Sequence, residues 1–225
     1  MKVYQARFIF ILFSIITGIT LFPVEKAFAT SIAIVNPSFE ADIQGYGGYS
    51  YLFISGWGGN GTNGTWYPST TYYPSGVPDG VNIAYNNFGT LSQTLTTLLA
   101  DSTTYTLGVW IGLRGDYAAW GSHNYVIELL AGSTVIATAA NPVIPGVGQF
   151  GLATLTYTSA LIDPYAGQAL GIALINYGPQ MNYDNVTLNA SPSNASPSVP
   201  EPATLVLVGL GFAALGLASC RKTIS

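Results

Sequence analysis

The segment from residue 30 to residue 190 consists of short runs of β-favouring residues, each ended by a turn signal. It is rich in Gly, Thr, Tyr, Val and Ile and has no sustained helical spacing of apolar residues. Nine strands are expected, over residues 32–35, 81–85, 90–95, 104–113, 125–130, 134–139, 152–157, 169–176 and 183–189. Nine short strands in about 160 residues predict one all-β domain, a jelly roll or β-sandwich.

Alternation of side chains predicts which residues face the core in two of these runs. In the run 104–113 the expected core residues are Tyr105, Leu107, Val109 and Ile111. In the last run, Asp184 is expected on the same face as Val186 and Leu188. A carboxylate buried there without a partner costs several kcal/mol. Asp184 is therefore the acid that most needs an explanation.

The first 29 residues have the organisation of a secretory signal peptide. Two basic residues precede an apolar run from 8 to 22, and Ala27 and Ala29 form a small-x-small site for signal peptidase. A retained membrane anchor is the alternative, and the small residues at the cleavage position argue against it. We therefore expect the mature chain to begin near residue 30 and to be exported.

The other end of the chain has three parts. Residues 191–198 are a Ser, Pro, Asn and Ala linker, and the sequence Val199-Pro200-Glu201-Pro202 follows it. An apolar run of 17 residues from 203 to 219 then precedes Arg221 and Lys222. As a helix this run would be about 25 Å long, enough for a minimal membrane crossing with the basic residues on the cytoplasmic side.

This arrangement resembles the PEP-CTERM sorting signal of Gram-negative bacteria, which an exosortase processes, commonly in organisms that make exopolysaccharide. An ordinary tail anchor would explain the helix and the charges, but not Pro200-Glu201-Pro202. The resemblance implies that residues 199–225 are a transmembrane sorting signal. It also implies that the protein is located at the cell envelope, the outer surface or the extracellular matrix.

Removing the two ends exposes an unbalanced charge. Residues 30–190 contain eight Asp and Glu residues, and Arg114 is their only Lys or Arg, which gives a net charge of −7. Nucleic-acid binding is excluded because such proteins need clustered basic residues. A surplus of carboxylates outside the cell favours Ca²⁺ instead. The only cysteine is Cys220, so the domain has no disulfide. We expect Arg114 to pair with a carboxylate of the domain, with Asp116 as the nearest candidate; the alternative is an exposed charge.

Two short motifs at the ends of the domain point to a metal site. The sequence 36–40, Asn-Pro-Ser-Phe-Glu, and the sequence 183–188, Tyr-Asp-Asn-Val-Thr-Leu, resemble the first and last strands of galactose-binding-like jelly rolls, including carbohydrate-binding modules. In such domains the corresponding Glu and Asp often help to hold a structural Ca²⁺. The resemblance implies a site with Glu40 and Asp184, completed by backbone carbonyls. The alternative is a solvated Glu40 and an Asp184 that accepts backbone amides.

A glycine-rich stretch from 45 to 74 carries nine aromatic residues. Aromatic faces stack on sugar rings, and short amides and hydroxyls bond to sugar hydroxyls. The candidate ligand-binding residues are Trp57, Trp66, Tyr67, Tyr72 and Tyr73. The alternative for each of them is a place in the core.

Short segments in the same order also resemble a cyanobacterial group with the same fold. They are residues 77–80, 91–95, 103–107, 112–114 and 183–186. The group includes the calcium-dependent Stig cyclases of hapalindole-type alkaloid biosynthesis, in which an aspartate of the last strand is the acid. The resemblance assigns that role to Asp184 and implies a closed apolar pocket around it.

Three hypotheses follow. The first is a non-catalytic surface or matrix protein whose Ca²⁺-stabilised jelly roll binds glycan, such as the exopolysaccharide of its own cell. The second is a calcium-dependent cyclase-like enzyme with Asp184 as acid. The third is a purely structural envelope protein. The domain has one histidine and no Gly-x-Ser-x-Gly sequence, so neither a histidine-rich metal centre nor a typical nucleophile elbow is expected.

Overall fold

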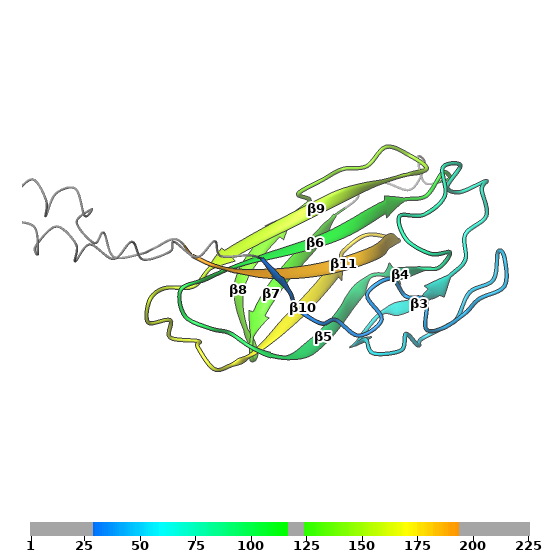
Figure 1. Cartoon of the computed structure of the whole chain (residues 1–225). Helices are drawn as coiled ribbons and strands as arrows, with labels where there is room; N and C mark the ends of the chain where they lie inside the picture. Colours follow the sequence, from blue (N-terminus) through cyan, green and yellow to red (C-terminus); the bar gives the residue numbers. More distant parts are fainter. Residues whose placement is uncertain (1–28, 117–123, 194–225) are drawn as a thin grey trace, which may run out of the picture.

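The computed structural model describes residues 29–116 and 124–193, which form two antiparallel β-sheets packed face to face (Figure 1). These residues contain no helix, and so no helix that could cross a membrane. The strands are β1 (Thr30–Ser31), β2 (Gly58–Gly59), β3 (Thr62–Trp66), β4 (Ile83–Asn87), β5 (Gly89–Leu98), β6 (Thr103–Leu113), β7 (Tyr125–Ala131), β8 (Thr134–Ala140), β9 (Gln149–Thr158), β10 (Ala169–Asn176) and β11 (Met181–Pro192). The predicted all-β fold is confirmed.

The strand order is that of a jelly roll. The first sheet has the order β3-β4-β11-β6-β9, with β1 beside part of β11, and the second has the order β2-β5-β10-β7-β8. The chain passes from one sheet to the other between most consecutive strands. Consecutive strands thus lie in opposite layers and bury a common core between the sheets.

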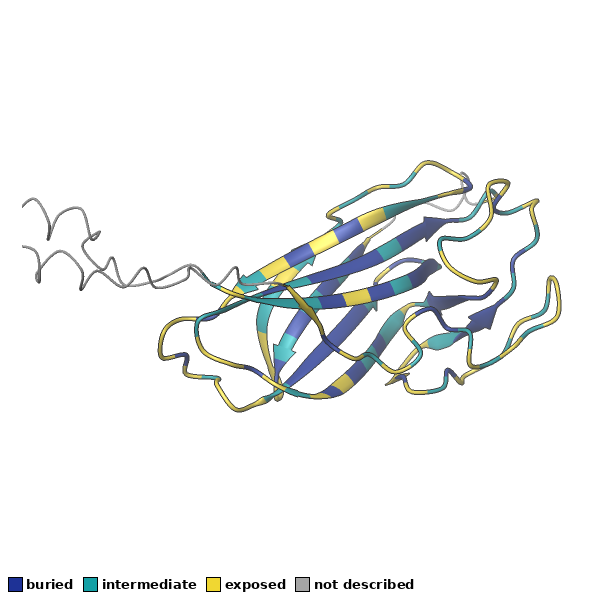
Figure 2. Ribbon diagram, in the orientation of Figure 1, coloured by how far each residue is buried: buried dark blue, intermediate teal, exposed yellow. Residues whose placement is uncertain are grey.

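The inner faces of the two sheets supply the main core. The predicted core residues of β6, Tyr105, Leu107, Val109 and Ile111, are all buried in it. Figure 2 shows the resulting alternation of buried and exposed positions along β9. A second, smaller apolar cluster, with Trp66, Tyr73, Ile83 and Tyr85, contains residues of β3 and β4 that point away from this core. The outer face of the first sheet is therefore also covered at its β3 edge.

Eight of the nine predicted strands are present, but residues 32–35 do not form one. The Ile32 amide still donates to the Leu188 carbonyl, and the chain then turns at Asn36, which has a φ of 51°. At Val35 the side chain of Gln93 replaces a neighbouring strand. Its Oε1 accepts from the Val35 amide at 2.8 Å, and its Nε2 donates to the Val35 carbonyl at 2.9 Å.

The expected alternation in the last strand is wrong at Asp184. Tyr183, Val186 and Leu188 lie in the main core, although the first two are three residues apart. A register shift of β11 against β6 between Asp184 and Thr187 explains this, because a bulge reverses the facing of the residues beyond it. Asp184 pairs with Trp110, outside both apolar clusters, so it faces away from the main core.

The two ends of the sandwich are formed by different parts of the chain. The strand β1 pairs with the end of β11, so residue 30 and residue 192 lie at the same end (Figure 1). The loops from 42 to 80 and the turn before Met181 lie at the other end, beside β3 and β4. The 12 residues of β11 separate the two ends by about 35 Å.

Substitution of Gln93 tests the side chain that replaces a strand. Gln93→Ala removes two bonds to Val35 and a third to the Gly56 carbonyl. We expect the free energy of unfolding to fall by about 1–3 kcal/mol, measured by urea denaturation. The exposed neighbour Thr94 supplies the control. Thr94→Ser should change the free energy of unfolding by less than about 0.5 kcal/mol. Equal effects of the two substitutions would contradict the assigned role.

Candidate functional site

An open cleft of about 400 Å³ lies at the end of the domain that is farther from residues 30 and 192. It is formed by the 47–51 segment, the strands β3 and β4, the end of β6 and the turn before β11. The lining residues are Gly47, Tyr49, Tyr51, Thr62, Trp66, Tyr72, Tyr85, Asn87, Arg114 and Gln180. None of these described residues is a carboxylate.

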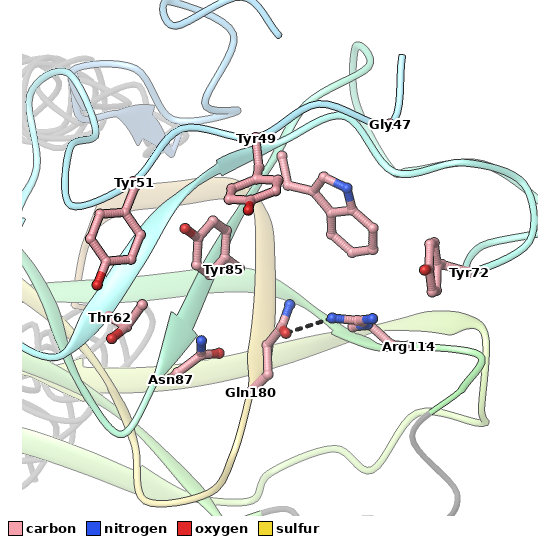
Figure 3. A pocket seen from close by; sticks show the side chains of 10 residues that line it. Gly47, Tyr49, Tyr51, Thr62, Tyr72, Tyr85, Asn87, Arg114 and Gln180 are labelled. Carbon is pink, nitrogen blue, oxygen red and sulfur yellow. Dashed lines mark hydrogen bonds between the residues drawn. The ribbon is translucent and has the colours of Figure 1, made fainter. Parts of the chain in front are cut away.

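Aromatic side chains form one wall of the cleft. Tyr49 and Tyr51 are 66% and 64% exposed, and their rings face the polar side chains across the cleft (Figure 3). Tyr49 packs edge-on against Tyr85 with ring centroids 6.3 Å apart, and Trp66 packs in the same way against Tyr72 at 5.0 Å. The wall thus offers both exposed ring faces and rings that are fixed from behind.

Arg114 occupies the other wall and is held from several sides. Its guanidinium carbon lies 5.0 Å from the Trp66 ring centroid and 4.7 Å from that of Tyr72. Its Nη1 donates to Gln180 at 2.7 Å (Figure 3). Its Nε and Nη2 donate to the two oxygens of Asp116 at 3.0 and 2.8 Å, which confirms the expected pair. The only basic residue of the domain is therefore a fixed part of the cleft.

Asn87 adds an acceptor to the same wall. Its Oδ1 is buried and has no hydrogen-bond partner among the described residues. A buried acceptor without a donor is costly, and a ligand hydroxyl would relieve that cost if the Asn87 side chain turned its Oδ1 toward the cleft. Asn87 and Gln180 meet because the register of β4 and β11 pairs Asn86 with Met181. Neither residue carries a sequence signal of its own, since only the strand register brings the two together.

A second, smaller pocket of about 210 Å³ lies beside the cleft. Tyr46, Tyr67 and Tyr73 line it, together with residues of the 76–81 turn. Tyr46 packs edge-on against Tyr67 at 5.3 Å, and its hydroxyl accepts from the Thr70 amide. Hydrogen bonds with the Thr70 side chain and the Thr70 amide lower the pKa of Tyr46. The two pockets take neighbouring residues from the same segments, so they lie next to each other.

The five aromatic residues predicted to bind ligand therefore lie in three places. Trp66 and Tyr72 line the cleft, and Tyr67 and Tyr73 line the smaller pocket. Trp57 is buried in the main core, where its indole nitrogen donates to the Asn36 carbonyl at 3.1 Å. The exposed Tyr49 and Tyr51 were absent from the predicted set. Their spacing of two residues in an extended segment is the signal that could have identified them.

The acids predicted to hold a metal lie on the outer face of the first sheet, below the turn 78–80. Glu40 accepts from the amides of Val81 and Asn82 at 2.8 and 2.6 Å, and from the Asn82 side chain at 3.0 Å. Gly80, with a φ of 61°, permits this approach, because a Cβ there would collide with the Glu40 carboxylate. Asp184 accepts from the amides of Asp79 and Asn185 at 3.0 and 2.7 Å. The same turn thus contacts both acids.

Burial raises the pKa of Asp184 to about 8. The two backbone amides lower it, and the nearby Asp79 and Glu40 carboxylates raise it further. Asp79 itself accepts from the Ser38 hydroxyl at 2.6 Å. Two neighbouring carboxylates therefore add to the effect of burial on Asp184.

The chemistry of these residues fits a Ca²⁺ ion in part. Asn82 is fully buried, and its Oδ1 has no hydrogen-bond partner among the described residues. This leaves an amide oxygen beside the carboxylates, of the kind that Ca²⁺ accepts. Across residues 29–116 and 124–193, however, no three His, Cys, Asp or Glu side chains converge on one point. Backbone carbonyls and water would have to supply the remaining ligands.

Asp184 is not part of the cleft. It lines neither pocket, and it follows the lining residue Gln180 by four positions, about 13 Å along an extended chain. Asn182 lies between them and accepts from the Tyr73 hydroxyl at 2.8 Å. An apolar pocket around Asp184 therefore stays a prediction, since neither the cleft nor the smaller pocket includes this residue.

The remaining predicted positions concern export. Ala29 is exposed at the start of the described chain. Ala27, the linker beyond residue 193, the motif Val199-Pro200-Glu201-Pro202 and the apolar run after it lie outside the described residues.

Comparison with known proteins identifies relatives of similar fold. A Stig cyclase from Fischerella sp. TAU, in complex with (3Z)-3-(1-methyl-2-pyrrolidinylidene)-3H-indole, is 31% identical with a TM-score of 0.68, over 74% of this chain and all of that one. A cyclase from the same source, in complex with 4-(1H-indol-3-yl)butan-2-one, is 32% identical with a TM-score of 0.66, over 74% and 100% of the two chains. A carbohydrate-binding module in complex with β-1,4-galactotriose is 16% identical with a TM-score of 0.43, over 69% and 95%, too low to bear on ligands.

Family models match both parts of the chain. Residues 198–222 match the PEP-CTERM protein-sorting motif, which makes this an exported protein that an exosortase sorts to the cell surface, as in Gram-negative bacteria. No curated protein matches the chain significantly. Residues 30–189 match the HpiC1 cyclase model. With most of its length matched, the chain belongs to the HpiC1-like cyclase family.

Proposed function

We propose that this protein is a surface-sorted glycan-binding protein, which binds sugar rings in the cleft and is stabilised by Ca²⁺ at the Glu40–Asp184 region. The observation that carries the proposal is the composition of the cleft. Exposed Tyr49 and Tyr51 rings face Asn87, Gln180 and Arg114, and no described lining residue is an acid. Such a site can bind a ligand, but its described lining has no carboxylic acid to donate a proton.

Sugar recognition needs flat apolar faces and a mixture of donors and acceptors. The tyrosine rings supply the faces, which stack on the C–H side of a pyranose. Arg114 supplies donors, and Asn87, whose Oδ1 lacks a donor within the described chain, would supply an acceptor when its side chain turns toward the ligand. A pair of neighbouring hydroxyls satisfies both requirements at once. The cleft volume of about 400 Å³ lies within the usual range for small-ligand sites.

The position of the cleft favours a role at a surface. The chain leaves the domain at Pro192 and continues into the sorting motif, whereas the cleft lies at the other end of β11. A domain held by its C-terminal end would present the cleft away from the membrane. A polymer outside the cell, such as exopolysaccharide, can approach it from that side.

Ca²⁺ would stabilise the folded domain and would not contact the glycan. Burial and the neighbouring acids disfavour the charged form of Asp184, and a divalent cation would remove that cost. Glu40, Asp184 and the Oδ1 of Asn82 are the side-chain groups that would hold it. The ion would fix the 78–82 turn, which borders the smaller pocket.

Substitutions in the aromatic wall test glycan binding. Tyr49→Ala and Tyr51→Ala each remove an exposed ring, so they should leave folding intact and weaken binding about fivefold or more, about 1 kcal/mol per stacked ring. A glycan array followed by calorimetry measures this. Tyr177→Ala is the matched control, since Tyr177 is 57% exposed and outside the cleft. Absence of any glycan ligand, or equal weakening by all three, would refute the proposed site.

Calcium is tested by thermal unfolding. If Ca²⁺ binds only the folded protein, a concentration 100 times its Kd adds about 2.7 kcal/mol, or about 5–10 °C in Tm. Chelator should reverse the gain, and Glu40→Gln with Asp184→Asn should abolish it. Glu128→Gln, an acid on the second sheet, should keep it.

Thermal unfolding at different pH values tests the state of Asp184. In chelator, the folded protein retains a proton on Asp184, with a pKa of about 8, that the unfolded chain releases near its ordinary value of 3.8. Stability should therefore fall as the pH rises from about 4 to about 8, and Asp184→Asn should flatten this fall. A Tm insensitive to Ca²⁺ at every pH would argue against the metal.

A second function, acid-catalysed cyclisation of an indole substrate, is favoured by the family match. Asp184 would be its acid. Its position argues against the role, because both carboxylate oxygens accept backbone amides and neither pocket includes it.

Incubation with a hapalindole-type indole precursor and Ca²⁺ separates the two functions. We expect no conversion by the wild-type domain, monitored by mass spectrometry and chromatography. A cyclised product that forms with the wild type and is lost with Asp184→Asn would replace the binding function by a catalytic one.

A further inference from the structure

We infer that the cleft selects neutral glycans and rejects acidic ones, and that the Arg114–Asp116 pair sets this selection. The inference rests on the proposed glycan binding and adds the chemical class of the ligand. It is carried by the contacts of Arg114 and by the charge of the surrounding domain.

An arginine in a sugar-binding site often binds a carboxylate of the ligand through two parallel hydrogen bonds. Here the Asp116 carboxylate already occupies that position on Arg114. Asp116 takes the fork of Arg114, with Nε–Oδ1 and Nη2–Oδ2 distances of 3.0 and 2.8 Å. Such a two-bond pair is the arrangement in which arginine binds a carboxylate most strongly. A uronic acid would have to displace Asp116, which is tied to the chain two residues away and therefore has a high local concentration.

The other contacts of Arg114 hold it in this orientation. Gln180 accepts from Nη1, and the rings of Trp66 and Tyr72 lie against the guanidinium. The guanidinium cannot turn toward a new anion without losing several of these contacts. Because Asp116 compensates its charge, Arg114 offers a ligand hydrogen-bond donors but no net positive charge. It also supports the aromatic wall.

The net negative charge of the domain also disfavours acidic glycans. With Arg114 and Asp116 compensating each other, residues 30–190 still carry seven uncompensated acids. Repulsion of a polyanion by such a domain is partly screened by salt, over about 8 Å at physiological ionic strength. Asn87 lines the cleft, and its Oδ1 has no donor among the described residues. If the side chain turns this oxygen toward the ligand, a hydroxyl can donate to it and a carboxylate cannot. Both effects favour an uncharged, hydroxyl-rich ligand.

A matched pair of ligands tests the inference. Gluco-, manno- and galacto-oligosaccharides are measured by calorimetry, each before and after selective oxidation of its C6 hydroxyls to carboxylates. For wild-type protein we expect the oxidised form of the best ligand to bind at least tenfold more weakly. Binding of the neutral form should change little between 50 and 500 mM salt, since no net charge is neutralised.

Asp116→Asn supplies the decisive variant, because it releases the fork of Arg114. We expect the tenfold difference to shrink to threefold or less, and binding of the oxidised form to weaken with added salt. Glu128→Gln changes the net charge equally but lies on the second sheet, so its ratio should remain that of the wild type.

The possible outcomes are distinct. Equal or tighter binding of the oxidised ligand by wild type would overturn the inference and leave glycan binding in place. An unchanged ratio in Asp116→Asn, or the same shift in Glu128→Gln, would overturn the assigned role of the pair. Absence of binding by every neutral and oxidised oligosaccharide would overturn both the inference and the proposed function.

Discussion

The pairing of β11 with β4 on one side and β6 on the other is the constraint on which the rest of the structure depends. The β4 register brings Gln180 beside Asn87, and the β6 register brings Gln180 within reach of Arg114. The same strand carries Asp184 to the turn at Asp79. One strand thus positions both the polar wall of the cleft, which no local sequence motif encodes, and the acidic region.

The sequence allowed most of the fold to be predicted, because turn residues delimit the strands and alternation identifies the core face of β6. Prediction failed where a long-range contact outweighs a local preference. Residues 32–35 have strand-forming side chains, yet the side chain of Gln93 takes the place of a neighbouring strand. The bulge after Asp184 reversed the expected facing. In the candidate site, Trp66 and Tyr72 could be named from composition, whereas Asn87 and Gln180 could not, since strand register alone joins them.

Family membership and site chemistry give different information here. The relatives of similar fold are cyclases bound to indole compounds, but the cleft of this chain has a polar wall, with Arg114 fixed by Asp116 and Gln180. The buried acid lies elsewhere, under a turn, among two other carboxylates. A jelly roll separates these regions because strands fix the outer face of the sheet, while the loops at one end vary in content. The same scaffold can therefore hold different ligands at one rim without altering its core.

The pairing of the first and last strands, β1 and β11, at one end of the sandwich also has a mechanical consequence. A load applied between a ligand at the cleft and an attachment beyond Pro192 would run along β11, which lies inside the first sheet and not at its edge. Its hydrogen bonds to β1, β4 and β6 are perpendicular to that direction and would be strained together, in shear, instead of opening one after another. Forced extraction of such a strand is governed by the unfolding rate. The topology is thus suited to a domain that is pulled lengthwise.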